Sequence, residues 1–457
     1  EEYNLKLTLI GRAGVKSVFF VKYLSARCSD LGIKELVLMD IDEKKLEIIG
    51  SLCRYVIESS GADLKLVLTT DPVEAVRDAQ WIVTAVRSGA EHSRAVDERI
   101  ALKHGIIGQE TTGPGGFSMA LRSIGVIEEY CRLASIYAPN AWIFNFTNPS
   151  GLVTQAMRQR GYNRVVGICD TPSSTKLRMA RVLGIPPESL YVEMFGLNHL
   201  SWIKSVVYNN CELLPKLVKD KGFLSKVEEF SIFDPELIAM LNYLPNEYLY
   251  YYYHREKALA NILSSPYTRG EMVERNSREM LEKLGEIDIK REPEKAMDIY
   301  MHYCGKRESS YMSVEAKLRR EDAKTEKGTG PQGYAGVAFD FIESVTGRKT
   351  GSHLVLSVPN NGSIDVVNDD DVVEVTCRIE KDGPVPVKIS GISEHTANLI
   401  RSVKLYERKT VEAFYSKSRT LAIEALMVHP LVCSYSLAKS IVEDIFDAYK
   451  DILGDWR

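Results

Sequence analysis

The sequence lacks any apolar run long enough to cross a membrane. Its longest apolar stretches, such as Trp81 to Val86, are the size of a strand, whereas a membrane helix needs about 20 apolar residues. The chain also lacks a marked excess of charge, since 58 basic residues stand against 62 acidic ones, for a net charge of −4. We therefore expect no membrane partner and no bulk attraction to nucleic acid.

Paired cysteines are missing as well. The eight cysteines show no CxxC pair and no regular spacing, which is typical of reduced thiols in an intracellular enzyme. Residues 1–10, EEYNLKLTLI, lack the basic and apolar segments of an export signal. We therefore expect a cytoplasmic protein whose cysteines are mostly small core residues.

The chain has enough apolar material for a large core. Apolar residues make up 45% and charged residues 26% of its 457 residues, close to the averages of soluble globular proteins. This length exceeds what one core normally serves. We expect two domains, residues 1–200 and residues 201–457.

A strand, a glycine turn, a helix and a second strand open the chain. Leu5 to Ile10 is a compact apolar strand, Gly11-Arg12-Ala13-Gly14 is a turn, and Ser17 to Leu31 is an amphipathic helix. The second strand, Glu35 to Met39, ends at Asp40. This layout is typical of an NAD-binding βαβ unit, in which Gly11 and Gly14 admit the pyrophosphate and Asp40 binds the ribose. The alternative is an ordinary α/β turn.

Strands and helices continue to alternate up to about residue 200. We expect further strands at 64–69, 81–86, 141–146 and 164–169, and helices at 72–79 and 118–137. This predicts an α/β fold with an N-terminal Rossmann-like, doubly wound parallel sheet of the lactate/malate dehydrogenase type.

Polar motifs directly follow three of these strands. They are Val86-Arg87-Ser88-Gly89, Asn145-Phe146-Thr147-Asn148-Pro149 and Cys169-Asp170. Because ligands of such sheets bind at the carboxyl ends of the strands, we expect the motifs to meet there.

Beyond about residue 205 the pattern changes. Residues 213–320 are expected to be mostly helical, short β-like runs stand at 353–358, 372–379 and 385–389, and long helices return at 394–450. We interpret this half as a C-terminal α+β domain packed against the first. Arg319 to Gly333, charged and glycine-containing, is the best candidate for a mobile surface loop.

Three groups of residues are candidates for chemistry. Thr147-Asn148-Pro149 resembles the substrate loop of lactate and malate dehydrogenases, although Asn-Pro is also a common turn. Cys169 and His199 would suit a divalent cation that keeps positions open for substrate oxygens, the alternative being ordinary core and surface residues.

The third group is the tyrosine run from Tyr248 to His254. At helical spacing most of its five rings are expected to be core or wall. One of them would suit a base, because a nearby metal and a cationic nicotinamide would lower the pKa of a phenol.

Four longer motifs occur in order along the chain: Gly105 to Phe117, Asn145 to Gly151, Gly196 to Trp202, and Asn360 to Ile364. Together they resemble glycoside hydrolase family 4, the NAD- and metal-dependent glycosidases, and within it the 6-phospho-β-glucosidase branch. The resemblance covers most of the chain. Leu200-Ser201, after the histidine, is similar to the β-specific branch.

The resemblance implies hydrolysis without net oxidation. NAD⁺ takes hydride from the sugar C3, a base removes the acidified C2 proton, and the C1 substituent is eliminated; water then adds and the hydride returns. A divalent cation, usually Mn²⁺, binds the C2 and C3 oxygens and acts as a Lewis acid. Family members are commonly homodimers or homotetramers.

By position, the resemblance makes Cys169 and His199 the metal ligands. It makes Asp40 the ribose-binding acid and Asn148 the residue that orients the substrate. Asn198, beside the histidine, is a further candidate for substrate binding.

The resemblance also implies a base and an acid. The tyrosine base matches Tyr248, with Tyr251 as the runner-up. Glu110 matches an acidic residue proposed for acid catalysis, with a structural role as the alternative. Arg87 and Arg94 would grip a sugar 6-phosphate, or else form a salt bridge at the domain interface.

Three segments depart from the family pattern. Family members usually have Gly-Gly-Gly-Ser followed by Thr-Pro, whereas this chain has Gly11-Arg12-Ala13-Gly14-Val15-Lys16-Ser17. Asp170 stands where β-type enzymes commonly have Asn and α-type enzymes His. The family's Tyr-Ser pair occurs here as Tyr311-Met312-Ser313.

Other functions stay open on the sequence alone. Within the family, the alternatives to a β-glucoside as substrate are an α-glucoside, a galactoside and a uronic acid glycoside. The Asn148 loop leaves an NAD-dependent 2-hydroxy acid dehydrogenase as an alternative. The irregular glycine turn leaves a non-catalytic or redox-sensing NAD-binding protein as another.

Overall fold

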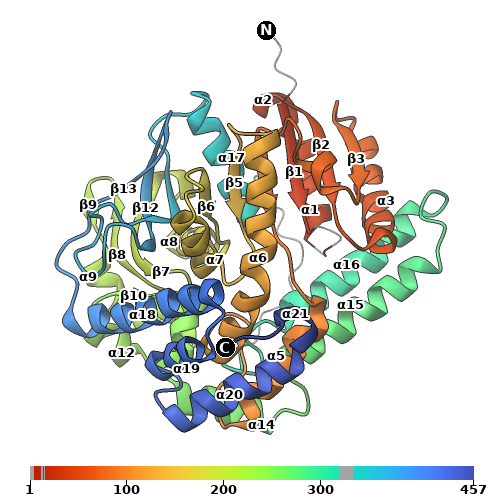
Figure 1. Cartoon of the computed structure of the whole chain (residues 1–457). Helices are drawn as coiled ribbons and strands as arrows, with labels where there is room; N and C mark the ends of the chain where they lie inside the picture. Colours follow the sequence, from red (N-terminus) through yellow and green to blue (C-terminus); the bar gives the residue numbers. More distant parts are fainter. Residues whose placement is uncertain (1–4, 12–13, 15, 319–332) are drawn as a thin grey trace.

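A nine-stranded sheet forms the centre of the computed structural model, which describes residues 5–11, 14, 16–318 and 333–457 (Figure 1). Its strands lie in the order β13-β12-β11-β6-β5-β4-β1-β2-β3, and the six from β1 to β6 are parallel. Read from β3 to β6, this is the doubly wound dinucleotide-binding order, which confirms the predicted Rossmann-like fold. The strands are β1 Leu5–Ile10, β2 Ile33–Met39, β3 Lys65–Thr69, β4 Trp81–Thr84, β5 Trp142–Asn145, β6 Val165–Gly167, β11 His353–Pro359, β12 Val372–Glu380 and β13 Gly383–Pro386.

Helices cover both faces of this sheet, which explains why its inner strands are continuous apolar runs. All residues of β4 and β5 are buried. Figure 1 shows α6 crossing one face, where it packs on α4 and α7, while α1, α3 and α17 cover the other. These helices are α1 Ser17–Ser25, α2 Cys28–Leu31, α3 Glu43–Ser60, α4 Pro72–Val76, α5 Ala90–Lys103, α6 Gly113–Tyr137, α7 Ser150–Gln159, α8 Thr171–Leu183 and α17 Gly333–Val345.

Strands from the second half of the chain complete the sheet of the first half. β11 pairs with β6 through Ser357 and Gly167, and β12 and β13 follow, all antiparallel. The sheet therefore crosses the domain boundary placed at residue 200. As a division of tasks along the chain, that boundary stays a prediction.

A smaller sheet contains a tight hairpin that the sequence patterns did not indicate. Its order is β10-β8-β7, with β9 paired to β8, over Tyr191–Leu197 (β7), Leu200–Tyr208 (β8), Cys211–Glu212 (β9) and Leu244–Pro245 (β10). Leu197 pairs with Leu200, so Asn198 and His199 form the two-residue turn.

Three predicted helices differ from those observed. The helix expected over 72–79 ends at Val76. The helix expected over 17–31 is interrupted between Ser25 and Cys28. The helix expected over 118–137 begins at Gly113, because its glycines are required there rather than being helix breakers. A Cβ atom on Gly115 would lie 2.0 Å from the carbonyl oxygen of Gln109.

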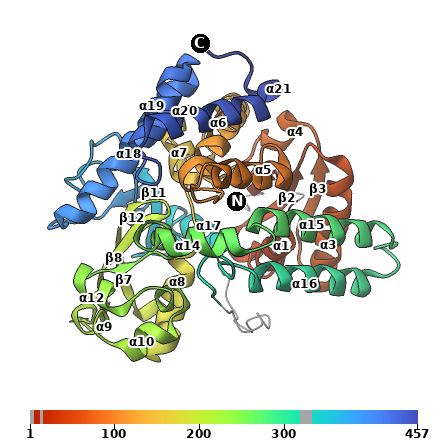
Figure 2. The ribbon, with the colours of Figure 1, turned by 90° about the horizontal axis from the view of Figure 1, so that it is seen from below.

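The C-terminal half is mostly helical, as expected. Figure 2 shows α15 and α16 side by side near α3 and α5. The predicted loop falls on residues 319–332, which lie outside the described residues. Among the described helices, none has both the length and the apolar character needed to cross a bilayer. The helices are η1 Pro187–Ser189, α9 Leu214–Leu217, α10 Lys221–Lys226, α11 Glu228–Ser231, α12 Pro235–Leu241, η2 Glu247–Leu249, α13 Tyr250–Tyr253, α14 Arg255–Ser264, α15 Arg269–Gly285, α16 Pro293–Ser309, α18 Glu394–Ser416, α19 Arg419–Val428, α20 Tyr435–Ala448 and α21 Lys450–Leu453.

A candidate active site at the carboxyl edge of the sheet

Four parallel strands end around one cavity of about 300 Å³. Its wall includes Gly11 after β1, Arg87 after β4, Asn148 after β5 and Cys169 after β6. The polar motifs therefore meet at this edge of the sheet, as the alternation of strands and helices predicts. Other residues singled out from the sequence also line the cavity, among them Gly14, Arg94, Glu110, His199 and Tyr248.

Cys169 and His199 face each other in this wall. The Sγ atom of Cys169 lies 3.6 Å from Nε2 of His199. The other ring nitrogen, Nδ1, lies 2.8 Å from Oγ1 of Thr111. Because that hydroxyl donates to Oε1 of Gln109, it accepts the Nδ1 proton and leaves the Nε2 lone pair toward Cys169.

Burial favours the uncharged forms of both side chains. It lowers the pKa of His199 to about 4 and raises the pKa of the Cys169 thiol, to which the carboxylates of Glu374 and Asp170 add. An imidazole with an unprotonated Nε2 is the form that binds a metal, and a cation beside the thiol would favour its thiolate.

This pair fits a cation that shares its coordination with a substrate. Among the described residues, no group of three or more His, Cys, Asp and Glu side chains is arranged to hold an ion. Two protein ligands are too few for a closed structural site, but they leave positions open, as a catalytic site requires.

Tyr248 lies flat against His199. The two ring centroids are 3.7 Å apart and the ring planes differ by 2°. Tyr251 also lines the cavity, with its ring 6.2 Å from that of Tyr248. Burial raises the pKa of Tyr248 well above its usual value, and the charges of Glu247 and Glu110 add to the rise. The lowered pKa expected of a tyrosine base therefore requires bound cations, which the protein alone does not supply.

Two arginines share one carboxylate where α5 borders the cavity. Nη1 of Arg87 lies 2.6 Å from one oxygen of Glu110, and Nη1 of Arg94 lies 3.0 Å from the other. Burial opposes ionisation of Glu110, but the two guanidinium groups outweigh it and hold its pKa well below the usual range. A general acid must carry a proton, so this environment favours a counter-ion.

The turn after β1 keeps part of the expected dinucleotide geometry, although residues 12, 13 and 15 lie outside the described chain. Gly11 has a φ of 75°, and a Cβ atom there would lie 2.7 Å from Cα of Val86. A Cβ atom on Gly14 would meet no atom of the described residues within 4 Å. Gly14 is part of the cavity wall.

Asp40 lies at the same edge of the sheet, because β2 pairs in parallel with β1. Its carboxylate accepts a hydrogen bond of 3.1 Å from the backbone N–H of Asp42. The next residue, Ile41, is 84% exposed, which is unusual for a large apolar side chain.

Models of one enzyme family match both halves of the chain. The Family 4 glycosyl hydrolase model matches residues 6–185, and the model of that family's C-terminal domain matches residues 194–432. The chain belongs to glycosyl hydrolase family 4. The 6-phospho-beta-glucosidase of Escherichia coli is 31% identical over 98% of this chain and 96% of its own length.

Solved family 4 structures have the same fold. A 6-phospho-alpha-glucosidase from gut microorganisms, in complex with NAD and Mn²⁺, has a TM-score of 0.83 at 25% identity, with both chains fully covered. The 6-phospho-beta glucosidase of Thermotoga maritima, with NAD and glucose-6-phosphate, has a TM-score of 0.80 at 28% identity and covers 98% of this chain and 99% of its own.

Three arginines that line the cavity of this family 4 chain, Arg178, Arg269 and Arg307, were not predicted from the sequence. Arg269 donates to Oγ of Ser310 and, at 2.8 Å, to the carbonyl oxygen of Arg307. The ion pairs among the described residues include none for Arg269, whose pKa is lowered to about 10 by burial and by Arg94 and Arg307.

A sequence signal for this arginine existed. Thr268 and Glu271 form a capping box, a pattern that predicts a helix start and so places Arg269 in the first turn. The pattern predicts the helix but not which cavity its first turn borders.

Two departures from the family 4 pattern turn out to be partners. Nζ of Lys16, in the irregular turn, lies 2.7 Å from the carboxylate of Asp170. This ion pair joins the end of the dinucleotide turn to the residue that follows Cys169.

The structure does not bring Asn198 to the main cavity. Its side-chain amide donates to Glu374 at 2.8 Å, and the Ser201 hydroxyl donates to the same carboxylate at 3.0 Å. Asn198 thus lies behind His199, where it supports the hairpin turn. Its substrate role stays a prediction that this geometry does not favour.

Proposed function

We propose that this chain hydrolyses a 6-phosphorylated β-glucoside with NAD and a divalent cation such as Mn²⁺. The observation that carries the proposal is the cluster of Cys169 and His199, 3.6 Å apart, with the ring of Tyr248 on the same imidazole. Similarity to the 6-phospho-beta-glucosidase of Escherichia coli and to the Thermotoga maritima structure with NAD and glucose-6-phosphate supports it.

When bound, NAD⁺ supplies a reversible hydride acceptor for the sugar C3, and the cation supplies positive charge at the C2 and C3 oxygens. The chain would hold the pyrophosphate at Gly11 and Gly14 and the ribose at Asp40. A carboxylate at this position repels a 2′-phosphate, which favours NAD over NADP. Ile41 offers an exposed apolar surface beside it.

Cys169 and His199 would hold the cation, Asn148 would orient the sugar, and Tyr248 would remove the C2 proton. The ring of Tyr248 stacks on that of His199, so a cation held by His199 would lie near Tyr248. That positive charge would oppose the burial that raises the pKa of Tyr248 in the protein alone.

Arg87, Arg94 and Arg269 bind the sugar phosphate, since guanidinium groups suit phosphate oxygens. Glu110 already occupies Nη1 of Arg87 and of Arg94. Arg269 forms no ion pair with a carboxylate among the described residues, and Glu315 and Glu110 act on it only at longer range, so its charge is more available to a ligand than that of Arg87 or Arg94. We assign Glu110 as the counter-ion of the first two arginines, and its role as an acid stays a prediction.

The direct test is incubation with 4-nitrophenyl 6-phospho-β-glucoside, NAD⁺ and Mn²⁺ under reducing conditions. We expect nitrophenol release without net NADH, and loss of activity with a chelator. NADH in proportion to product, as from a 2-hydroxy acid dehydrogenase, would refute the proposal. Cleavage of only the unphosphorylated, galactoside or uronic acid analogue would change the assigned substrate.

The base is tested with Tyr248→Phe and, as its matched control, Tyr251→Phe. If Tyr248 removes the proton, its loss lowers kcat by about 10²- to 10⁴-fold, the usual contribution of a general base. Tyr251→Phe keeps kcat near the wild-type value. The reverse result would transfer the role to Tyr251.

A second candidate is the α-linked substrate. The fold is similar, with a TM-score of 0.83, to that of a 6-phospho-alpha-glucosidase, and the maltose-6'-phosphate glucosidase of Bacillus subtilis is 30% identical over 98% of this chain. Assay of the α-linked nitrophenyl analogue beside the β-linked one decides between them by the ratio of kcat/KM.

A further inference from the structure

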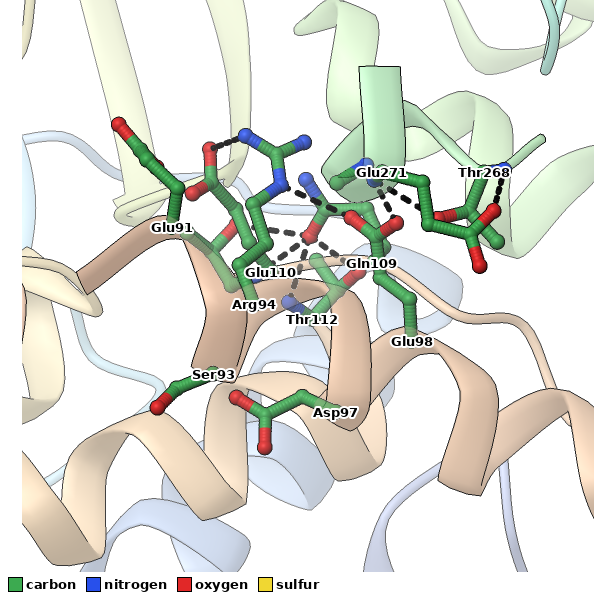
Figure 3. Close-up of polar contacts among 12 residues, drawn as sticks. Glu91, Ser93, Arg94, Asp97, Glu98, Gln109, Glu110, Thr112, Thr268 and Glu271 are labelled. Atoms are coloured by element: carbon green, nitrogen blue, oxygen red, sulfur yellow. Dashed lines mark hydrogen bonds and ion pairs between the residues drawn. The ribbon is translucent and has the colours of Figure 1, made fainter. Parts of the chain in front are cut away.

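A buried carboxylate, Glu98, lies between α5 and the start of α15 (Figure 3). One oxygen accepts a hydrogen bond of 2.9 Å from Nε of Arg94, one turn earlier on α5. The other accepts a hydrogen bond of 2.6 Å from the backbone N–H of Gly270. The side chain of Glu98 is 1% exposed, so these contacts are shielded from water.

Helix α15 can approach Glu98 because residue 270 is a glycine. A Cβ atom there would lie 2.8 Å from Oε2 of Glu98 and 3.1 Å from Cα of Ala95. The Gly270 N–H is one of the first N–H groups of α15, which have no partner within the helix. A carboxylate at this point satisfies that donor and is favoured by the helix dipole.

Glu98 thereby fixes two arginines that line the cavity. Glu98 holds Nε of Arg94 while Glu110 holds its Nη1, so the plane of that guanidinium is set by two carboxylates. Arg269 directly precedes Gly270, so the bond to Glu98 fixes the backbone that carries the Arg269 side chain. The two arginines come from opposite halves of the chain.

We propose that Glu98 is a positioning residue for recognition of the substrate's phosphate, acting through Arg94 and Arg269. This inference rests on the proposed function, in which those arginines bind the phosphate. Glu98 itself does not line the cavity. It acts by keeping two cationic groups at a set separation, which a rigid phosphate recognises better than mobile side chains.

The test compares Glu98→Gln with the wild-type holoenzyme on 4-nitrophenyl 6-phospho-β-glucoside. The amide keeps the size of the side chain but removes its charge and one acceptor oxygen. We expect KM to rise about tenfold, the weight of one charge-assisted hydrogen bond, while kcat changes little. The Kd of glucose 6-phosphate, measured by calorimetry, should rise in parallel, and that of NAD⁺ should not.

Glu271→Gln is the matched control. It removes a carboxylate from the same first turn of α15, but one whose partners are the backbone of Thr268 and the exposed Arg99. We expect a wild-type KM. If Glu98 serves only the packing of α5 on α15, Glu98→Gln will lower the melting temperature and leave KM unchanged, which overturns the inference.

Glu98→Asp covers the case in which Glu98→Gln does not fold. It keeps the charge, but it is one methylene too short to reach both Arg94 and Gly270, so KM should again rise. An unchanged KM overturns the inference. A wild-type holoenzyme that neither binds glucose 6-phosphate nor cleaves the phosphorylated glycoside would refute the proposed function instead.

Discussion

Helix α5 takes part in two buried ion pairs, one through Asp97 and one between Arg94 and Glu98. They differ in how many of the arginine's N–H donors already have a partner. On one side, Asp97 accepts hydrogen bonds of 3.1 and 2.7 Å from Arg122, 2.7 Å from Ser118 and 2.8 Å from Tyr449. On the other, Arg94 reaches Glu98 and Glu110 beside the cavity (Figure 3). Close to them lies Arg269, which forms no ion pair with a carboxylate among the described residues and interacts with Glu315 and Glu110 only at longer range.

Under the proposed function, this difference separates charges that stabilise the fold from charges that bind the substrate. The guanidinium of Arg122 is fully buried, has two bonds to one carboxylate, and lies over the ring of Tyr449 at 4.0 Å. A ligand cannot reach it. Arg269 is also buried, yet it lines a cavity and its partners are a hydroxyl and a carbonyl. Burial alone therefore does not distinguish the two arginines, and the proposed role of Arg269 rests on its place in the cavity wall.

Removing Arg122, which is paired with Asp97, should have the largest effect. This effect should fall on the free energy of unfolding and not on activity. Arg122→Met leaves Asp97 buried without its cation, which costs about 3–5 kcal/mol of unfolding free energy. Urea unfolding measures this loss. The control is Arg132→Met, which removes an exposed ion pair on α6, the helix that also carries Arg122. A loss of kcat/KM in the folded Arg122→Met enzyme would contradict the comparison.

Glu374 is a buried carboxylate whose hydrogen-bond partners, Asn198 and Ser201, are uncharged. Unlike Asp97, it has no paired arginine among the described residues, so its effect on stability should depend on pH. Burial raises its pKa to about 7, against the hydrogen bonds from Asn198 and Ser201. The folded chain therefore keeps a proton that the unfolded chain loses above its ordinary pKa, about 4.5. Raising the pH from 4.5 through 7 should remove about 3 kcal/mol of stability.

Glu374→Gln cannot titrate, so its stability should lack this part of the pH dependence. Urea unfolding at pH 5 and pH 8 for both proteins measures the difference. Equal pH dependence in the two proteins would show that Glu374 is ionised in the fold.

Removing Arg269 should weaken substrate binding more than it lowers the stability of the fold. Arg269→Met is expected to lower kcat/KM on the phosphorylated glycoside by about 30-fold, or roughly 2 kcal/mol for a charge-assisted contact. The melting temperature should fall less than in Arg122→Met, because Arg269 forms no ion pair with a carboxylate among the described residues and acts on Glu315 only at longer range. Arg275→Met, from an exposed pair on the same helix, is the control, and an equal loss in both variants would contradict the assignment.

The smallest effect is expected from removing the Tyr449 hydroxyl, an uncharged group that donates to Asp97. Tyr449→Phe removes the hydroxyl that contacts Asp97 and the Ser93 carbonyl, at a cost of about 1 kcal/mol. Tyr435→Phe, on an exposed ring of α20, should cost nothing measurable. A cost above that of Arg122→Met would mean that the hydroxyl, rather than the ion pair, stabilises this side of α5.

The sequence predicted the parallel sheet and the meeting of Asn148 and Cys169, because strand periodicity and turn residues are local properties. It also placed His199 near Cys169, though only through family motifs, since the hairpin that brings them together has weak local signals. Arg269, Glu98 and Glu374 were missed. Their positions depend on how α15 packs on α5 and β12 on β7, which no window of the sequence contains.

The pairing of β6 with β11 sets a constraint on synthesis. Strands β1 to β6 leave the ribosome long before residues 353–359 exist to cover the open edge of β6. Until then the nascent chain presents an unpaired strand, the kind of edge to which other chains add. A fragment that ends before residue 353 would therefore contain the strands of the dinucleotide-binding half, but the edge of β6 would stay unpaired and prone to pair with other chains.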